Sequence, residues 1–166
     1  MILYPDYYLN NITNISLELI EKENIKGLIL DVDNTLIDFN HKTIEGLEEW
    51  CNNLKENGVK FCVLSNSNKR KKVEKISNLL GVPYIFFAMK PFKKGFKESA
   101  KLLNLNNKEI AVVGDQIFTD VLGANRCKMK SILVKPIAEK DYLITIIKRP
   151  LEKYILKKYE EKQKNK

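Results

Sequence analysis

The sequence predicts an α/β protein built on a doubly wound, Rossmann-like parallel sheet of about five strands. Short apolar runs, typical of strands buried on both faces, alternate along the chain with segments of helical spacing. Because strands joined through helices need crossover connections, these strands lie parallel. Polar clusters follow several of the predicted strands, at the sheet edge where α/β proteins bind ligands.

Apolar runs mark the strands, and apolar residues at helical spacing mark the helices between them. Gly58 and Gly81 directly follow two of the helices and act as stop signals, because glycine readily adopts the left-handed conformation that ends a helix. Residues 1–24 are predicted as a short extended arm and a helix. In chain order we predict strands at 27–32, 59–64, 83–87, 109–113 and 131–134, and helices at 43–57, 69–80, 92–103 and 117–127.

The character of the chain changes beyond Pro136, so we predict a domain at 1–136 and a basic helical tail at 137–166. Residues 142–147 are apolar, and a basic amphipathic helix is expected to start near Pro150, because proline favours the first turn of a helix. Two interpretations stay open for this helix. It lies on an anionic membrane surface, or it packs its apolar face on the domain.

The composition limits the partners and the compartment. The formal net charge is +8, which suggests an anionic partner such as membrane lipid, nucleic acid or polyphosphate. Nucleic acid is disfavoured, because the sequence has no basic stripe interleaved with aromatic residues. Three cysteines without a CxxC pair and one histidine argue against a zinc site. The N-terminus does not resemble a signal peptide, so we expect a cytoplasmic protein that can touch the inner membrane surface.

Two acidic residues close the first predicted strand. Asp31 ends an apolar run, and Asp33 follows two residues later. Two acids this close repel each other, and a hard cation such as Mg²⁺ removes that repulsion. An Asx turn explains one of these acids but not both. A calcium loop of the EF-hand type does not fit, because Leu36 stands where that loop needs glycine and Lys42 where it needs glutamate.

Three further polar clusters follow later strands. Ser65 and Asn66 can hold a phosphoryl oxygen, although the same pair is common in turns. Lys90 can neutralise a phosphate, or it is simply solvated. Asp115 can complete a magnesium site, while Asp120 either supports that site or stabilises the first turn of the next helix.

Together these motifs resemble those of the haloacid dehalogenase-like phosphatases. The motifs are DVDNT at 31–35, Ser65, Lys90 and GDQIFTD at 114–120, in matching order at the ends of successive strands. The segments 4–8 and 133–137 are similar to the YqeG-type branch of subfamily IIIA. The resemblance covers nearly the whole chain, and it implies the family's catalytic core.

The resemblance also implies roles for the site residues. Asp31 would attack phosphorus and form an aspartyl-phosphate, and Asp33 would protonate the leaving oxygen and then activate water. Mg²⁺ would bind Asp31, the backbone carbonyl of Asp33, and Asp115. The remaining side chains would support these groups: Ser65, Asn66 and Lys90 would hold the transferring phosphoryl group, and Thr35 and Asp120 would stand behind the metal ligands.

Family members often carry a cap domain over the site, but segments 36–64 and 91–114 are too short to hold one here. The site should therefore be open, which suits a large or surface-bound substrate, or cover by a second subunit. The YqeG-type resemblance implies phosphatidylglycerophosphate as the substrate. A soluble phosphomonoester or a nucleic-acid end is the alternative, and a phospho-accepting signalling module is a third function class.

Overall fold

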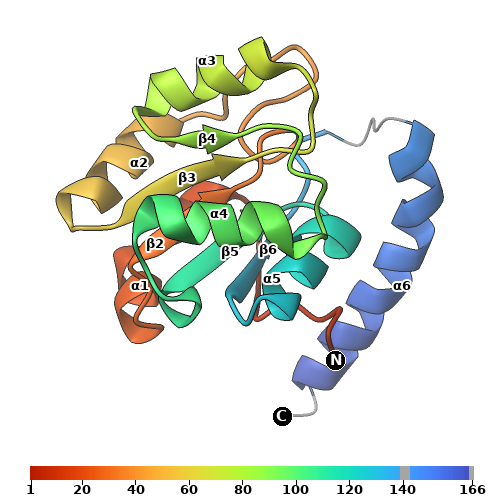
Figure 1. The fold of residues 1–166 in the computed structure, drawn as a ribbon. Coiled ribbons are helices and arrows are strands. Elements are labelled where there is room, and N and C mark those ends of the chain that lie inside the picture. The colour runs from red at the N-terminus through yellow and green to blue at the C-terminus, as the bar shows by residue number, and fades with distance from the viewer. Residues whose placement is uncertain (139–142, 165–166) are drawn as a thin grey trace.

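Six parallel strands form one sheet in the order β1-β6-β5-β2-β3-β4 (Figure 1). The computed structural model describes residues 1–138 and 143–164, and gives the backbone alone at 143–147. The strands are β1 (Tyr7–Leu9), β2 (Gly27–Leu30), β3 (Lys60–Leu64), β4 (Tyr84–Ile85), β5 (Ile110–Gly114) and β6 (Lys130–Val134). The helices are α1 (Leu17–Lys22), α2 (Leu47–Glu56), α3 (Arg70–Leu80), α4 (Lys93–Leu103), α5 (Leu122–Arg126) and α6 (Leu143–Lys164).

The predicted α/β class and all five predicted strands are confirmed, and the sheet gains a sixth strand. Part of the N-terminal arm forms β1, which pairs in parallel with β6 from Tyr7↔Ile132 to Leu9↔Val134. Three residues are too few to show a strand pattern in the sequence. A strand this short depends on its tertiary partner rather than on its own periodicity.

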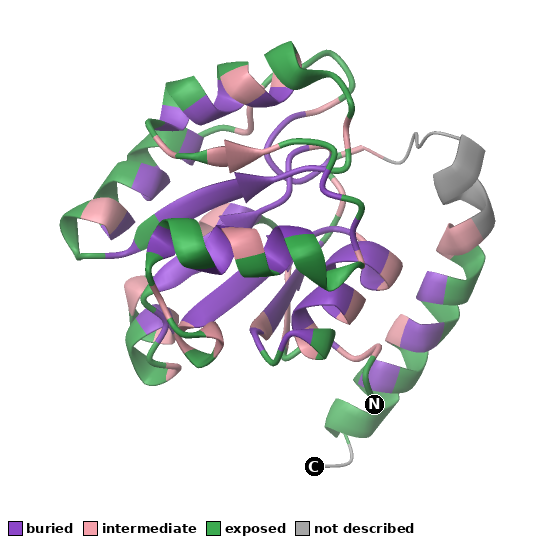
Figure 2. Cartoon of the chain, viewed as in Figure 1, coloured by how far each residue is buried: buried purple, intermediate pink, exposed green. Residues whose placement is uncertain are grey.

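Successive side chains of β2 lie in two different hydrophobic layers, because side chains alternate between the two faces of a strand. Leu28 and Leu30 belong to the cluster that also holds Trp50 of α2. Ile29 belongs to the cluster on the other side, with Phe96 of α4. The central strands are buried along almost their whole length (Figure 2), so helices cover both faces of the sheet.

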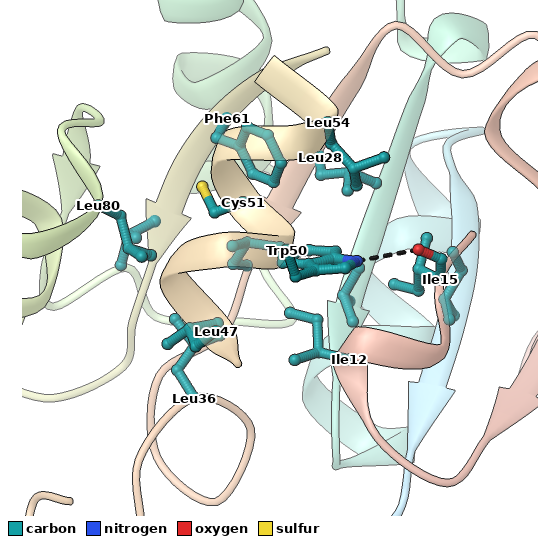
Figure 3. Close-up of a cluster of buried hydrophobic side chains, with 14 of the residues drawn as sticks. Ile12, Ile15, Leu28, Leu36, Leu47, Trp50, Cys51, Leu54, Phe61 and Leu80 are labelled. Carbon is teal, nitrogen blue, oxygen red and sulfur yellow. Dashed lines mark hydrogen bonds between the residues drawn. The ribbon is translucent and has the colours of Figure 1, made fainter. Parts of the chain in front are cut away.

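Trp50 ties α2 to the N-terminal segment at the centre of one layer (Figure 3). Its indole Nε1–H donates to the Ile15 carbonyl oxygen at 2.9 Å, and its ring meets Phe61 edge to face with the centroids 5.6 Å apart. Trp50→Phe keeps an aromatic ring but leaves this buried carbonyl without its donor. We expect the free energy of unfolding to fall by roughly 1–3 kcal/mol.

Urea unfolding followed by far-ultraviolet circular dichroism measures this effect. Leu79→Ala, at an exposed position of α3, is the control and should leave the transition midpoint almost unchanged. Equal midpoints for Trp50→Phe and wild type would contradict the stabilising role given to this hydrogen bond.

Two helix boundaries differ from the sequence prediction. The helix expected at 43–57 begins only at Leu47, because Thr43 forms an isolated antiparallel bridge with Ile37 in the preceding loop. The helix expected at 117–127 opens with a π-helical turn at Ile117–Val121 before α5. The amide of Val121 donates to the Gln116 carbonyl, five residues back. Such turns occur often at functional sites.

The predicted start of the C-terminal helix near Pro150 is wrong. Helix α6 begins at Leu143, so Pro150 lies inside it, where proline removes one hydrogen bond of the helical ladder. Part of the apolar segment predicted at 142–147 and of the tail at 137–166 lies outside the described residues. In the described part of the chain, no helix has the length and apolar character needed to cross a bilayer.

Candidate active site

The predicted site residues meet where the strand order reverses. From β2 the chain continues on one side to β3 and β4, and then returns to β5 and β6 on the other side. Asp31 follows β2, and Asp115 follows the neighbouring strand β5. The Asp31 amide donates to the Val113 carbonyl at 2.9 Å, which fixes the two strand ends side by side. Ligands of α/β sheets bind in the crevice at such a reversal.

Three buried carboxylates share this crevice. Asp31, Asp115 and Asp120 each place one oxygen within 4.8 Å of the others. Burial raises the pKa of Asp31 to about 6, with Lys90 opposing the shift and Asp120 adding to it. Burial likewise raises the pKa of Asp115 well above its usual value, and the other two carboxylates add to this effect. Carboxylates this close together need nearby positive charge to be ionised at the same time.

Lys90 joins two of these carboxylates. Its Nζ lies 2.6 Å from Asp31 Oδ1 and 2.7 Å from Asp120 Oδ1, and its side chain is almost fully buried. Burial lowers the pKa of this ammonium group, but the two carboxylates outweigh burial and raise the pKa above its usual value. The structure therefore brings Lys90 into the cluster, which removes the solvated alternative for this residue.

Asn66 fixes the backbone that presents Lys90. Its side-chain oxygen accepts from the Lys90 amide at 2.6 Å, and its Nδ2 donates to the Lys90 carbonyl at 3.1 Å. The peptide bond from Lys90 to Pro91 is cis. One acceptor site and one amide hydrogen of Asn66 are thus used in bracing Lys90. Its predicted contact with substrate stays a prediction.

Gly114 gives Asp120 the space to reach the cluster. A Cβ atom at position 114 would lie 2.2 Å from Asp120 Cγ, far inside van der Waals contact. The Asp120 Oδ2 atom also accepts from the Gln116 amide at 3.2 Å, across the π-helical turn. The glycine and the turn together aim this carboxylate back toward the strand ends.

Ser65 and Thr35 are buried in the same crevice. Ser65 Oγ accepts from the Ser67 amide at 3.1 Å, which leaves its hydroxyl hydrogen free to donate. Thr35 Oγ1 lies 3.3 Å from Asp31 Oδ2 and 3.5 Å from Asp115 Oδ1. Thr35 thus contacts both carboxylates, and its role behind the metal ligands stays a prediction.

Asp33 has a partner that the sequence did not reveal. Lys72, in the first turn of α3, places its Nζ 2.6 and 2.8 Å from the two carboxylate oxygens of Asp33. Asp33 is the more exposed of the pair, since 38% of its side-chain surface is accessible. A lysine in the first turn of a helix is slightly unfavourable because of the helix dipole. In the sequence, this was the feature that indicated a further role for Lys72.

The C-terminal helix also reaches the crevice. Arg149 Nη2 lies 2.7 Å from Asp115 Oδ2, and Arg149 Nη1 donates to the Asp115 carbonyl at 3.0 Å. Glu152, one turn later, accepts from the amides of Ile117 and Phe118 at 2.8 and 3.3 Å, at the start of the π-helical turn. Helix α6 runs along the side toward which β3 and β4 point (Figure 1).

Buried contacts hold α6 in this place. Ile155 packs with Ile117, Val121 and Leu133, and Tyr159 meets Tyr4 edge to face with the centroids 5.8 Å apart. Burial raises the pKa of Glu152, with Arg149 opposing the shift. The sequence left two interpretations for this helix, packing on the domain or lying on a membrane. These contacts correspond to packing on the domain.

The donor set fits a hard divalent cation. Three carboxylates converge in one buried crevice, and oxygen ligands of this type suit Mg²⁺. Two cationic side chains, Lys90 and Arg149, contact the three acids and offset part of their negative charge. The carbonyl ligand predicted at Asp33 stays a prediction. Asp120, expected behind the metal ligands, places its carboxylate together with those of Asp31 and Asp115.

Comparison with known proteins agrees with this geometry. A family model described as haloacid dehalogenase-like hydrolase matches residues 40–128. The chain is 40% identical over 153 residues to the Probable phosphatase YqeG of Bacillus subtilis, covering 92% of this chain and 88% of that protein. The chain belongs to the haloacid dehalogenase-like hydrolase family. The predicted resemblance, including the YqeG-type branch, is confirmed.

Two more distant similarities cover a smaller share of this chain. Glyceraldehyde 3-phosphate phosphatase of Pyrococcus furiosus is 28% identical over 102 residues, which are 57% of this chain and 42% of that protein. The crystal structure of an uncharacterised protein from Listeria monocytogenes serotype 4b superposes with a TM-score of 0.58 at 18% identity, covering 72% of this chain and 85% of that one. The latter likeness shows a shared fold and nothing more.

Proposed function

We propose that this hydrolase is a magnesium-dependent phosphatase that forms an aspartyl-phosphate on Asp31. The observation that carries the proposal is the buried cluster of Asp31, Asp115 and Asp120 bridged by Lys90. An aspartate this deeply buried among other acids is poorly placed for a purely structural ion pair. It is well placed for attack on a phosphate that is partly neutralised by Mg²⁺ and by lysine.

In the first step a carboxylate oxygen of Asp31 bonds to phosphorus as the ester oxygen leaves. Asp33 gives that oxygen its proton, so an alcohol departs and the phosphoryl group stays on Asp31. Lys90, and the hydroxyl group of Ser65, hold the phosphoryl oxygens as charge develops on them. The contact with Lys72 is that of the ionised Asp33, the form left after the proton has been given to the alcohol.

In the second step Asp33 takes a proton from a water molecule, whose oxygen attacks the phosphorus. The bond to Asp31 breaks, inorganic phosphate forms, and both carboxyl groups return to their starting state. Bound Mg²⁺ would supply positive charge that offsets repulsion between the nucleophile and the phosphate. Asp31 and Asp115 would hold the ion, with the Asp33 carbonyl as predicted and Asp120 as a further candidate ligand.

Phosphatidylglycerophosphate is the substrate that we favour. The YqeG-type resemblance implies it, and the short connections between the strands support a site open to a phosphate presented by a surface. From β2 to α2 the chain makes only a small loop closed by two isolated bridges, Asp33↔Ile37 and Ile37↔Thr43. A soluble phosphomonoester stays the alternative, supported by the partial match to the Pyrococcus enzyme.

Phosphate release from a substrate panel tests the proposal. The panel holds phosphatidylglycerophosphate in detergent micelles, glyceraldehyde 3-phosphate and p-nitrophenyl phosphate, each assayed with Mg²⁺ and with excess EDTA. We expect release to depend on Mg²⁺ and to be fastest with the lipid. Release that persists in EDTA would contradict the metal requirement, and turnover of the soluble esters alone would contradict the lipid substrate.

A further inference from the structure

The connection that carries Lys90 into the crevice exposes a group of large apolar side chains on its outer side. The side chains alternate between inside and outside. Ala88 and Lys90 are each 7% exposed, whereas Phe87, Met89 and Phe92 are 58, 54 and 60% exposed. Isolated exposed apolar residues are common, but several large ones together at the rim of a site mark an interaction surface.

The backbone of this connection is held in an uncommon conformation. Phe87 and Met89 have φ values of 49 and 55°, in the left-handed region that bulky residues rarely adopt. Hydrogen bonds keep them there, since the Phe87 amide donates to the Ser67 carbonyl and the Phe92 amide donates to the Met89 carbonyl. Strained backbone conformations cluster at functional sites. The exposure of two bulky apolar residues in such a conformation therefore indicates that they have a function.

A hollow lies among these side chains, and Phe86, Lys94 and Glu98 also line it. Arg70, at the start of α3, stacks over the Phe86 ring at 5.7 Å from the ring centroid. The apolar group therefore continues into the cationic first turns of two helices. We name this surface, formed by Phe86, Phe87, Met89 and Phe92, the apolar rim.

Cations surround the apolar rim on both sides. Lys69, Arg70 and Lys71 are exposed at the start of α3, and Lys93 and Lys94 are exposed at the start of α4. Lysine is depleted at protein–protein interfaces, so four lysines among these five cations favour a lipid surface over a protein partner. Rings that enter the acyl boundary while lysines meet anionic headgroups are typical of proteins that lie on a membrane.

We propose that the apolar rim and its flanking cations dock this protein on an anionic lipid bilayer, which places the crevice at the level of the headgroups. The inference rests on the proposed phosphatase function and names the surface that meets the substrate. Met89 and Phe92 flank Lys90 in one tight turn, so their insertion would bring the connection that carries Lys90 to the membrane surface. The contacting surface is then the β4–α4 connection (Figure 1), rather than α6.

Co-sedimentation with vesicles tests the docking. The vesicles are phosphatidylcholine with phosphatidylglycerol as the anionic lipid, and phosphatidylcholine alone. We expect wild type to bind the anionic vesicles, and the variant Phe87→Ser/Met89→Ser/Phe92→Ser to bind them at least about tenfold more weakly. The matched control, Leu79→Ser/Leu102→Ser, removes apolar side chains of 43 and 54% exposure elsewhere and should bind as wild type does.

A second pair of substitutions separates this surface from the C-terminal helix. Leu151→Ser/Tyr154→Ser removes exposed apolar side chains of α6 and should leave binding unchanged. Loss of binding in this variant, with normal binding of the triple variant, would overturn the proposal. Equal binding of the triple variant and wild type would overturn it as well.

A reporter makes the test independent of how well the triple variant folds. Phe92→Trp adds an exposed indole to a protein whose single native tryptophan, Trp50, is buried. The tryptophan fluorescence of Phe92→Trp should shift to shorter wavelength on addition of anionic vesicles. The fluorescence of Leu102→Trp should not shift. No shift in Phe92→Trp would overturn the docking.

The two proposals fail in different ways. Vesicle binding through the apolar rim without hydrolysis of any phosphomonoester would remove the phosphatase function and leave the docking surface. Hydrolysis in detergent micelles without vesicle binding would remove the docking surface and leave the phosphatase function.

Discussion

Asp31→Asn is expected to lower the rate of phosphate release by at least about 10³-fold, because an amide cannot act as the attacking nucleophile. The substitution keeps the size of the side chain and retains an oxygen that can accept from Lys90 Nζ. It also removes one of three crowded negative charges, so we expect the protein to stay folded. The prediction separates loss of chemistry from loss of structure.

Two measurements check this prediction. Initial rates give the loss of activity, and acid-quenched samples should show phosphate on wild type that is released by hydroxylamine, with none on Asp31→Asn. The control is Asp6→Asn, whose carboxylate accepts from the Ser131 amide near the start of β6, at the opposite edge of the sheet. A phosphorylated Asp31→Asn protein with normal turnover would show that another residue is the nucleophile.

The sequence was informative wherever local pattern and tertiary position coincide. The apolar run before Asp31 must be a buried parallel strand, so its last residue must lie at the ligand-binding edge. The same reasoning applies to Asp115 after β5. The alternation of strands and helices thus predicted the neighbourhood of Asp31 and Asp115 before any distance was known, and the structure confirms that they adjoin.

Other contacts depend on packing that no local pattern encodes. Lys72 reads as one more lysine in a basic helix start, yet it turns inward to Asp33. Arg149 and Glu152 lie far along the chain from the site, in a segment whose sequence fits a membrane-bound helix equally well. Only the docking of α6 against Ile117 and Leu133 decides their place. Local propensity is a weak guide to such long-range contacts.

Lys90→Met is expected to lower the free energy of unfolding by roughly 3–5 kcal/mol when no divalent cation is present, since it leaves two buried carboxylates without their ammonium partner. Methionine fills a similar volume, and the backbone bonds between Asn66 and residue 90 need no lysine side chain. The destabilisation should therefore come from charge rather than from packing. Lys97→Met, at an exposed position of α4, is the matched control and should change little.

Mg²⁺ is expected to stabilise the same variant, opposite to the destabilisation expected without a divalent cation. The cluster in Lys90→Met is more negative, so it should bind Mg²⁺ more tightly, and a ligand that binds only the folded state stabilises it. Urea midpoints measured in EDTA and in Mg²⁺ should differ more for Lys90→Met than for wild type, while activity stays low because no ammonium group holds the phosphoryl oxygens. Equal Mg²⁺ effects in both proteins would mean that Lys90 does not govern the charge of the carboxylate cluster. Restored stability without restored activity would instead assign Lys90 two separable tasks, one in folding and one in catalysis.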